Sequence, residues 1–485
     1  MHLLLSQHQR LVHTIGISLM VLCVALFAGL GSLLFLAIPF GLLFAALLCY
    51  NWKTAFWIML FFIPCSIQVW FLGDTLSTSL PDEPMMWLFL LLSLVLIASK
   101  PNSIPKWFWQ NPLTLLLILQ YIWLIFTVVF SHEPFFSIKF LAAKTWFLAS
   151  FVLIPIFVFQ EKKDWRKALI LLLIPTTLLM FVIFYKHWKL GFSFERIQVA
   201  IRYLFYNHVD YSTFLSMVLP MLCIAFYMSK GKGLFLRTLL AGLIIFYLVA
   251  INLAFARAAV LAVVFSFAIL VAIKWRLVNF VMPIFYAFIL FIVAYASNKN
   301  TYIDYRPDYT RTYMHTNFKE HIAATFKGQD MSSMERVYRW IAAIRMSADQ
   351  PITGYGPNSF YYYYKPYTVT SFVTYVSRNP EHSTTHNYFL LMLVEQGLPG
   401  MILYGIVIFV FFAQAQKIYH RFKDPFYKSC TMALAMIFAA CFINNFFSEL
   451  IETHKIGAIF YLCISLMLVL NHKSKMEQIE GKFQS

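Results

Sequence analysis

The sequence predicts an all-α membrane protein that crosses the bilayer about 12 to 14 times. Hydrophobic residues make up 61% of the 485 residues and charged residues only 12%, whereas soluble domains carry about 25% charged residues. The mean hydropathy is +0.71. Apolar windows of roughly 17 to 22 residues recur along the chain, and each is long enough to cross a hydrocarbon core of about 30 Å as a helix. These observations exclude a soluble globular fold.

The apolar windows divide the chain into regions. About fourteen windows qualify as spans, at 11–29, 31–50, 54–73, 84–99, 112–131, 145–160, 167–186, 211–229, 234–252, 258–273, 278–296, 386–413, 429–448 and 456–471. We therefore expect N-terminal transmembrane helices at 1–296, a large loop at 297–385, C-terminal transmembrane helices at 386–471 and a tail at 472–485. The first group holds about eleven spans and the second about three. Apolar stretches in the loop predict amphipathic helices on the membrane surface.

The connections between spans carry a charge pattern that orients the protein. Alternate connections are basic and read NWK, SKPNSIPK, QEKKDWRK, SKGKGLFLR, KWR and QKIYHRFKDPFYK, whereas GDTLSTSLPDEP is acidic and NNFFSELIETHK is close to neutral. Because basic loops stay in the cytoplasm, both termini are expected to be cytoplasmic. The loop 297–385, the connection 186–210 and the surroundings of Arg257 then face outward. The net charge of +17 is spread over short loops, which argues against a nucleic-acid partner.

The sequence shows no motif for metal binding or for a disulfide framework. The seven cysteines lie mostly within apolar windows and include no CxxC spacing, so neither a disulfide framework nor a zinc site is expected. The outer loops contain no DxD motif or carboxylate cluster, and no metal or other cofactor is predicted. The first apolar window lacks a small-residue cleavage site and is expected to stay as a span.

The stretch SSMERVYRWIAAIRMSADQP predicts an amphipathic helix in the large loop. Ser332 precedes Glu335 by three residues, which is the spacing of a capping box. The apolar stripe consists of Val337, Trp340, Ile341 and Ile344. Arg336 shares a neighbouring face with Arg339, and we expect Arg336 to be a functional cation. For Arg339 and Arg345, contact with lipid phosphates is the leading interpretation.

His386 is the candidate general base. It begins the stretch HNYFLLMLVEQGLPG, which also contains Asn387, Glu395 and a GxxG turn. A neutral imidazole at the outer boundary can accept a proton from a hydroxyl near pH 7; the alternative is an interfacial or core histidine. On a helix from 386 onward, Asn387 and Glu395 cannot both share the face of His386, so a structural or electrostatic role is expected for Glu395. His382 is a secondary candidate.

Arginines provide a complementary anion site. Arg257, in NLAFARAAVLAVV, begins a span where a lone cation is costly unless it snorkels or meets an anion, and both interpretations stay open. Guanidinium groups such as those of Arg257 and Arg336 can hold a pyrophosphate bidentately and stabilise it as it leaves. Such clamps beside a base suit glycosyl transfer from a diphosphate donor. Arg202 and Asn207 are secondary candidates in the outward connection.

The aromatic run FYYYYKPY at 360–367 also faces outward in this topology. It fits an interfacial tyrosine belt, which we favour, or a surface on which sugar rings stack.

Four tracts resemble the O-antigen ligase and polymerase superfamily of bacterial inner-membrane glycosyltransferases. They are YNHVDYSTFLSMVLP, FARAAVLAV, ERVYRWIAAIRMSADQPITGYGPNSF and THNYFLLMLVEQGLPG. No single motif is strong, but the order and spacing of the Arg, Arg-x-x-x-Trp, Pro-x-x-Gly-x-Gly and His-Asn motifs are specific. Two departures concern the loops: Ala256 stands where a serine is common, and Pro357 and Asn358 occupy a turn where small residues are frequent.

The resemblance implies a GT-C-like helical fold with an active site at the periplasmic face of the inner membrane. It implies that the donor is a glycan on undecaprenyl diphosphate, that His386 is the base, and that Arg257 and Arg336 bind the diphosphate. Arg339, Asn387 and Glu395 are supporting residues in this scheme.

The leading function is an O-antigen ligase, which moves a polysaccharide to a sugar hydroxyl of lipid A-core and inverts the anomeric centre. Polymerases that extend the carrier-linked glycan, and oligosaccharyltransferases that glycosylate a protein Ser or Thr, share these motifs and are alternatives. A transporter of lipid-linked glycans is an alternative of another class. Transporters carry ionisable or broken-helix sites near the midplane, whereas polar residues within the spans here, such as Gln68 and Gln120, are few and uncharged.

Overall fold

The protein is an all-α polytopic membrane protein, which confirms the predicted fold class. The computed structural model describes residues 18, 22–23, 34–71, 76–298, 331–368 and 384–483. Within these residues, 12 helices are long and apolar enough to cross a membrane, and the only sheet is a two-stranded hairpin. Most of the expected first span, 11–29, lies outside the described residues. Each expected span from 84–99 onward coincides with one of the 12 helices.

The elements follow the chain in a simple order. The long helices are α2 (Leu34–Phe62), α3 (Asp82–Ser99), α5 (Pro112–Val129), α6 (Pro134–Leu148) with its π-helical and α7 continuation (Ala149–Leu153 and Pro155–Val158), α8 (Lys162–Lys189), α10 (His208–Met228), α11 (Leu234–Leu253), α12 (Arg257–Lys274), α13 (Val278–Ser297), α18 (Tyr388–Arg421), α19 (Pro425–Phe446) and α20 (His454–Phe483). Shorter elements are β1 (Ile67–Phe71), β2 (Leu76–Leu80), α4 (Lys106–Trp109), α9 (Ile197–Ile201), α15 (Met331–Asp349), α16 (Phe360–Tyr363) and the single turns η1 (Ile63–Cys65), η2 (Pro101–Ser103), η4 (Phe194–Arg196), η6 (Lys365–Tyr367) and η7 (Leu450–Glu452).

Helix α2 is folded back on itself at Asn51. The backbone of Asn51 leaves the helical region (φ −150°, ψ 80°), and its side chain accepts a hydrogen bond from the amide of Thr54 at 3.1 Å. The rings of Phe40 and Phe62 lie 6.1 Å apart, although an unbroken helix would separate these residues by about 33 Å. The two apolar windows 31–50 and 54–73 therefore form the arms of one hairpin. The end of the second window is wrong, because β1 begins at Ile67.

Three helices make up the interior. Of the apolar windows of α20, α19 and α10, 94%, 78% and 72% are buried inside the protein, compared with 11% for α13. Stacked rings join α18, α19 and α20: Phe438 lies 3.7 Å from Phe411 and 4.9 Å from Phe460. In a bilayer, helices associate mainly through such close packing, because lipid tails are as apolar as the side chains. The exposed apolar side chains of α11 and α13 are therefore suited to face lipid.

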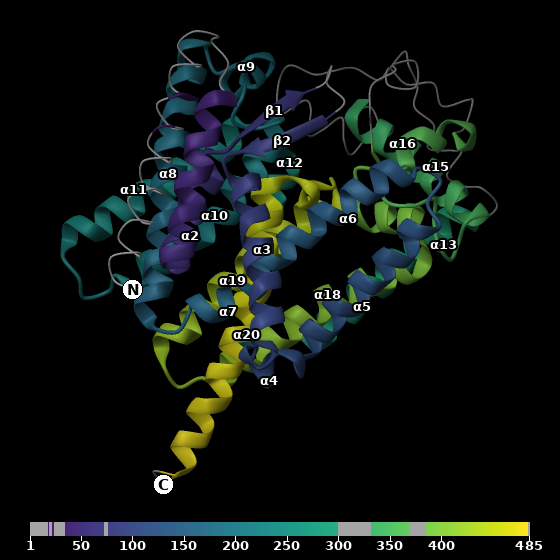
Figure 1. Cartoon of the computed structure of the whole chain (residues 1–485). Helices are drawn as coiled ribbons and strands as arrows, with labels where there is room; N and C mark the ends of the chain where they lie inside the picture. Colours follow the sequence, from purple (N-terminus) through teal and green to yellow (C-terminus); the bar gives the residue numbers. More distant parts are fainter. Residues whose placement is uncertain are drawn as a thin grey trace.

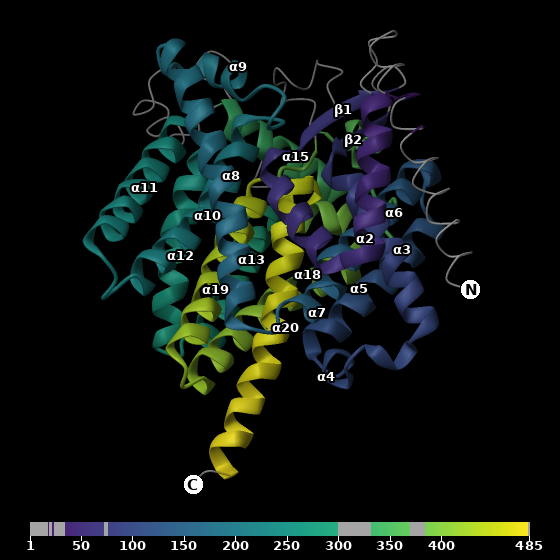
Figure 2. The same ribbon diagram turned by 60° about the vertical axis from the view of Figure 1, so that its left-hand side comes forward.

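The two ends of the molecule differ. Figures 1 and 2 show α4 and the chain's C-terminal end at one end, where α20 extends beyond the other helices. The hairpin β1–β2, α9, α15 and α16 lie toward the opposite end. The predicted outer segments thus gather at the end opposite the C-terminus.

Helix α18 is broken at Gly397, and the turn before α16 fills the break. Gly397 has φ 70° and ψ −176°. Across the break, the amide of Leu398 donates to the carbonyl of Pro351 at 2.8 Å, and the amides of Tyr355 and Gly356 donate to the carbonyls of Val394 and Glu395 at 2.9 and 3.0 Å. The chain around residues 351–356 is therefore locked onto α18.

Glycine is required at this junction because the two backbones touch. A Cβ atom on Gly397 would lie 1.9 Å from the carbonyl oxygen of Ile352, and one on Gly354 would lie 2.5 Å from the backbone of Glu395. Both glycines also have positive φ. The glycines of the Pro-x-x-Gly-x-Gly and Glu-x-Gly-x-x-Gly motifs thus allow one close approach of two chain segments.

Candidate active site

His386 lies in the short segment that leads into α18, facing α15. Asn387 caps α18 by accepting a hydrogen bond from the amide of Leu390 at 3.1 Å, and it donates to the carbonyl of Phe446 at 3.0 Å. The indole of Trp340 in α15 donates to the carbonyl of Thr385 at 3.0 Å. His386 has a φ of 51°, a conformation that a non-glycine residue adopts only when its surroundings enforce it. Neighbours on both sides therefore fix the histidine.

Charged groups of both signs surround the imidazole. Its Nδ1 lies 4.0 Å from Oε1 of Glu449, and the side chain of His386 is 34% exposed. Burial lowers the pKa of His386 well below its ordinary value, and the charges of Arg339 and Arg336 lower it further. The histidine is consequently neutral at physiological pH and able to accept a proton.

Arg339 is a buried cation. It is 3% exposed, so the interpretation that it contacts lipid phosphates is wrong. Among the described residues its Nε has no hydrogen-bond partner. Burial lowers the pKa of Arg339, and Glu335, Tyr364 and Glu449 oppose this shift. A buried guanidinium whose Nε donor lacks a partner among the described residues is suited to bind an anionic ligand.

Glu449 belongs to the site although the sequence did not single it out. Burial raises the pKa of Glu449 to about 7, against the opposing effects of Arg339, a hydrogen bond from the His386 backbone, and Arg336. The residue lies in NNFFSELIETHK, and the feature that the sequence shows there is a nearly neutral charge. One acidic residue at the end of a span gives no local pattern from which its partner could be recognised.

Arg336 also acts electrostatically on His208, at the start of α10. The ring of His208 packs against Phe194 at 5.7 Å, and Phe194 packs against Phe255 at 5.6 Å. Phe255 has a φ of 56° and precedes Arg257 by two residues. An aromatic contact thus connects the turn that begins α12 with the neighbourhood of Arg336. His208 was not among the sequence candidates, although its tract was part of the family resemblance.

The secondary candidates from the sequence have separate places. Arg202 stacks on its neighbour Tyr203 at 5.0 Å, and Asn207 caps α10 by accepting from the amide of Asp210 at 2.8 Å. Glu395 accepts hydrogen bonds from the amides of Ser359 and Phe360 at 3.1 and 3.3 Å, so it holds the turn before α16. His382 lies outside the described residues. The contacts of Asn207 and Glu395 are those of structural residues.

The segment that carries Glu449 is anchored on both sides. The carboxylate of Glu452 accepts from Lys144 at 2.8 Å and from the hydroxyl of Tyr388 at 2.5 Å. Lys455, which is 1% exposed, donates to the carbonyls of Pro64 and Leu204 at 2.9 and 2.5 Å. These bonds tie the segment between α19 and α20 to α6, α18 and the end of the α2 hairpin.

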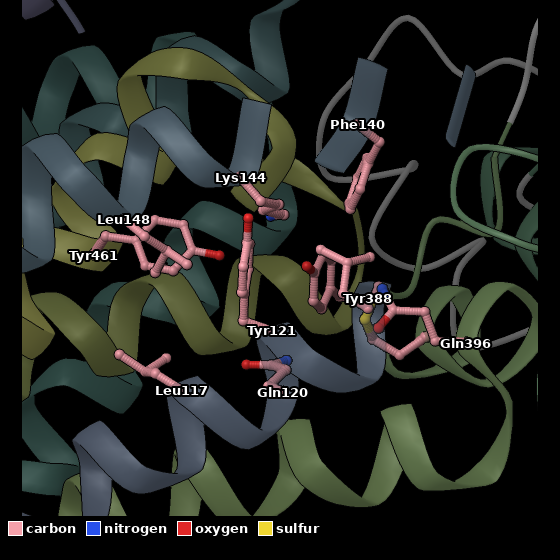
Figure 3. Close-up of a pocket in the computed structure, with 11 residues that line it drawn as sticks. Leu117, Gln120, Tyr121, Phe140, Lys144, Leu148, Tyr388, Gln396 and Tyr461 are labelled. Carbon is pink, nitrogen blue, oxygen red and sulfur yellow. The ribbon is translucent and has the colours of Figure 1, made fainter. Parts of the chain in front are cut away.

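A cavity lies next to this network, between α5, α6, α18 and α20. Its polar lining consists of Gln120, Tyr121, Lys144, Tyr388, Gln396 and Tyr461. Figure 3 shows the phenol groups of Tyr121, Tyr388 and Tyr461 around the Lys144 side chain. Tyr388 is two residues from His386, so the cavity adjoins the segment that carries the candidate base. Among the described residues, no group of three or more His, Cys, Asp or Glu side chains could hold a metal ion.

The aromatic run has polar partners at its surface. The hydroxyl of Tyr363 donates to Glu133 at 3.1 Å, and the hydroxyls of Tyr355 and Tyr367 lie 2.6 Å apart. Tyr367 in turn donates to Asp349. Both interpretations of the run, a tyrosine belt and a sugar platform, stay open.

Comparison with known proteins relates part of the chain to a family. No curated protein matches the chain. The profile of the O-antigen ligase family matches residues 242–405, a range that includes Arg257, Arg336, Arg339, His386 and Glu395 but not Glu449. Members of this family are glycosyltransferase-like enzymes. The match over this part of the chain supports the resemblance to the O-antigen ligase superfamily.

Proposed function

We propose that the protein is an O-antigen ligase of the bacterial inner membrane. It transfers a polysaccharide from undecaprenyl diphosphate to a sugar hydroxyl of lipid A-core at the periplasmic face. The observation that carries the proposal is a neutral, partly exposed histidine beside two guanidinium groups, Arg336 and Arg339, at the end of the molecule opposite the C-terminus. A base next to an anion clamp is what displacement of a diphosphate by a hydroxyl requires.

In the proposed reaction, Arg257 and Arg336 bind the diphosphate of the donor, with Arg339 as a supporting cation. The hydroxyl oxygen of the acceptor attacks the anomeric carbon, and the bond between that carbon and the diphosphate oxygen breaks with inversion. His386 takes the hydroxyl proton, and the diphosphate leaves as an anion whose charge the guanidinium groups stabilise. Every step uses groups of this chain and needs no metal.

The electrostatics give an order to these events. Burial, and after it the charges of Arg339 and Arg336, hold the pKa of His386 low, which makes the imidazole a weak base. A diphosphate bound to them offsets their charge, so the pKa of His386 rises when the donor is in place. The base therefore becomes effective only after the donor has bound.

The test is a gel profile of lipopolysaccharide and carrier-linked glycan from source cells with wild-type protein, a deletion, or stably expressed His386→Ala. We expect both mutants to accumulate carrier-linked polysaccharide while lipid A-core stays bare. His472→Ala is the matched control, because His472 stacks on Trp107 at 4.7 Å at the other end of the molecule; it should give the wild-type profile.

Two outcomes would redirect the proposal. Single repeat units capping the core in the mutants would identify a polymerase of the same superfamily. An unchanged profile would point to a protein acceptor, and a search for glycosylated Ser or Thr residues would follow.

A further inference from the structure

His386 has one acidic neighbour in the part of the chain that the structure describes. Oε1 of Glu449 is 4.0 Å from Nδ1 of His386, and no other described carboxylate lies within that distance. The second carboxylate oxygen of Glu449, Oε2, is buried and has no hydrogen-bond partner among the described residues. An imidazole that accepts a proton at Nε2 must carry its other proton at Nδ1, and that proton points best at an acceptor. Glu449 is placed to be this acceptor.

Hydrogen bonds between the two chain segments keep the side chains of His386 and Glu449 close to each other. Asn387, next to His386, donates to the carbonyl of Phe446 at 3.0 Å, only three residues before Glu449. On the other side, the hydroxyl of Tyr388 donates to the carboxylate of Glu452 at 2.5 Å, three residues after Glu449. The two chain segments are therefore joined on either side of the pair. At 4.0 Å, Nδ1 of His386 and Oε1 of Glu449 are within ion-pair range, and a small approach of the side chains would bring them to hydrogen-bond distance.

The charges around the pair create a need for a carboxylate. The groups that face His386 are Arg336 and Arg339 from α15 and Glu449; those that face Glu449 are the same two arginines, His386 and Glu452. When His386 takes a proton, an imidazolium forms beside two guanidinium groups, which is unfavourable. Glu449 is the one of these groups that is both negative when ionised and next to the ring.

We propose that Glu449 is the positioning residue of His386, a role that rests on the proposed function. Its carboxylate accepts a hydrogen bond from Nδ1–H, fixes the tautomer with Nε2 free, and stabilises the imidazolium. The hydroxyl proton moves to Nε2 as the new bond to the anomeric carbon forms and the diphosphate departs. Glu449 exchanges no proton with the substrate, and its ionised form is the one that stabilises the imidazolium, as in other carboxylate-histidine pairs.

The experiment measures transfer by the purified full-length protein, with carrier-linked polysaccharide and lipid A-core from the source cells, across a pH series. We expect Glu449→Gln to lower kcat about 100-fold with little change in KM, because the loss concerns the transition state. The acidic limb of the pH profile should move to lower pH, since an imidazole without its carboxylate has a lower pKa. Glu449→Asp should restore part of kcat.

Two further variants separate this role from a structural one. The double variant His386→Ala, Glu449→Gln should be no slower than His386→Ala alone, because the two residues act as a unit. Glu195→Gln, which alters an exposed glutamate in η4, should leave kcat and the pH profile unchanged. Melting temperatures of all variants show whether they are folded.

The results discriminate between the two proposals. A Glu449→Gln protein with wild-type kcat and pH profile, or additive losses in the double variant, would overturn the role of Glu449 while leaving the ligase intact. A His386→Ala protein that transfers glycan normally would instead overturn the proposed function itself.

Discussion

At the residue scale, buried cations in this protein fall into two kinds. Lys144 is buried against Glu452 at 2.8 Å, and the same carboxylate accepts from Tyr388. Arg339 is equally buried, but its Nε has no hydrogen-bond partner among the described residues. Removal of one member of a buried ion pair leaves the other charge uncompensated and is destabilising, whereas removal of a buried cation with an unsatisfied donor relieves a desolvation cost.

Substitution of Lys144 and of Arg339 by methionine should therefore affect stability differently. Lys144→Met strands Glu452 and should lower the free energy of unfolding by about 3–5 kcal/mol, the usual result of breaking a buried pair. Arg339→Met should leave the melting temperature in detergent unchanged or higher while it lowers transfer activity at least about tenfold. The double variant Lys144→Met, Glu452→Gln is the control and should be more stable than Lys144→Met alone. Equal losses of stability in Lys144→Met and Arg339→Met would contradict the distinction between the two cations.

The sequence identified part of this chemistry. His386 and Arg336 stand in motifs whose residue types are informative by themselves. For Arg339 the leading interpretation from the sequence is contact with lipid phosphates, with a supporting role at the site as the other, because helical spacing places a residue on a face but does not say what packs against that face. Glu449 was missed altogether, since its partner is 63 residues away in the chain and only the folded structure brings the two together.

At the element scale, two helices depart from the simple spans that hydropathy predicts. Helix α2 turns back at Asn51 and α18 is broken at Gly397. The mean hydropathy of a window reports how long an apolar stretch is. It cannot detect a hairpin or a break, because neither changes the amino-acid composition of the stretch. The glycine and proline of EQGLPG did indicate a turn, but the partner that fills the break, the segment around Pro351, could be recognised only in the fold.

Gly397→Ala tests the junction between α18 and the turn before α16. The added Cβ would meet the backbone of Ile352 at 1.9 Å, and alanine disfavours the positive φ. We expect a loss of at least about 2 kcal/mol in the free energy of unfolding, together with weaker transfer, since the junction fixes α18 and the chain just before this helix carries His386. Gly242→Ala is the control, because nothing lies within 4 Å of its added Cβ; its melting temperature should stay at or above that of the wild type.

At the scale of the whole molecule, the candidate residues gather at one end. The helices that carry them come from widely separated parts of the chain, yet α10, α15, α18 and the connection between α19 and α20 meet around His386 and Arg336. Loop charges predicted that these residues share one side of the membrane. That condition does not determine convergence, which depends on how α10, α19 and α20 pack in the interior.

Fusion reporters test the orientation that the loop charges predict. Alkaline phosphatase inserted after Ser193, between α8 and α10, should be active, and the same insertion after Ser103, between α3 and α4, should be inactive. A fluorescent protein attached to the C-terminus should fold and fluoresce in the cytoplasm. The reverse set of activities would place His386 on the cytoplasmic side and remove the basis for a periplasmic reaction.

Helix α15 carries both Arg336 and Arg339, and it is also bonded to the chain just before the candidate base. The indole of Trp340 in this helix donates to the carbonyl of Thr385, the residue that precedes His386. A shift of α15 would therefore move the two guanidinium groups and the imidazole together. One helix thus sets the spacing between the cations and the candidate base, and whatever displaces it would change the site as a unit.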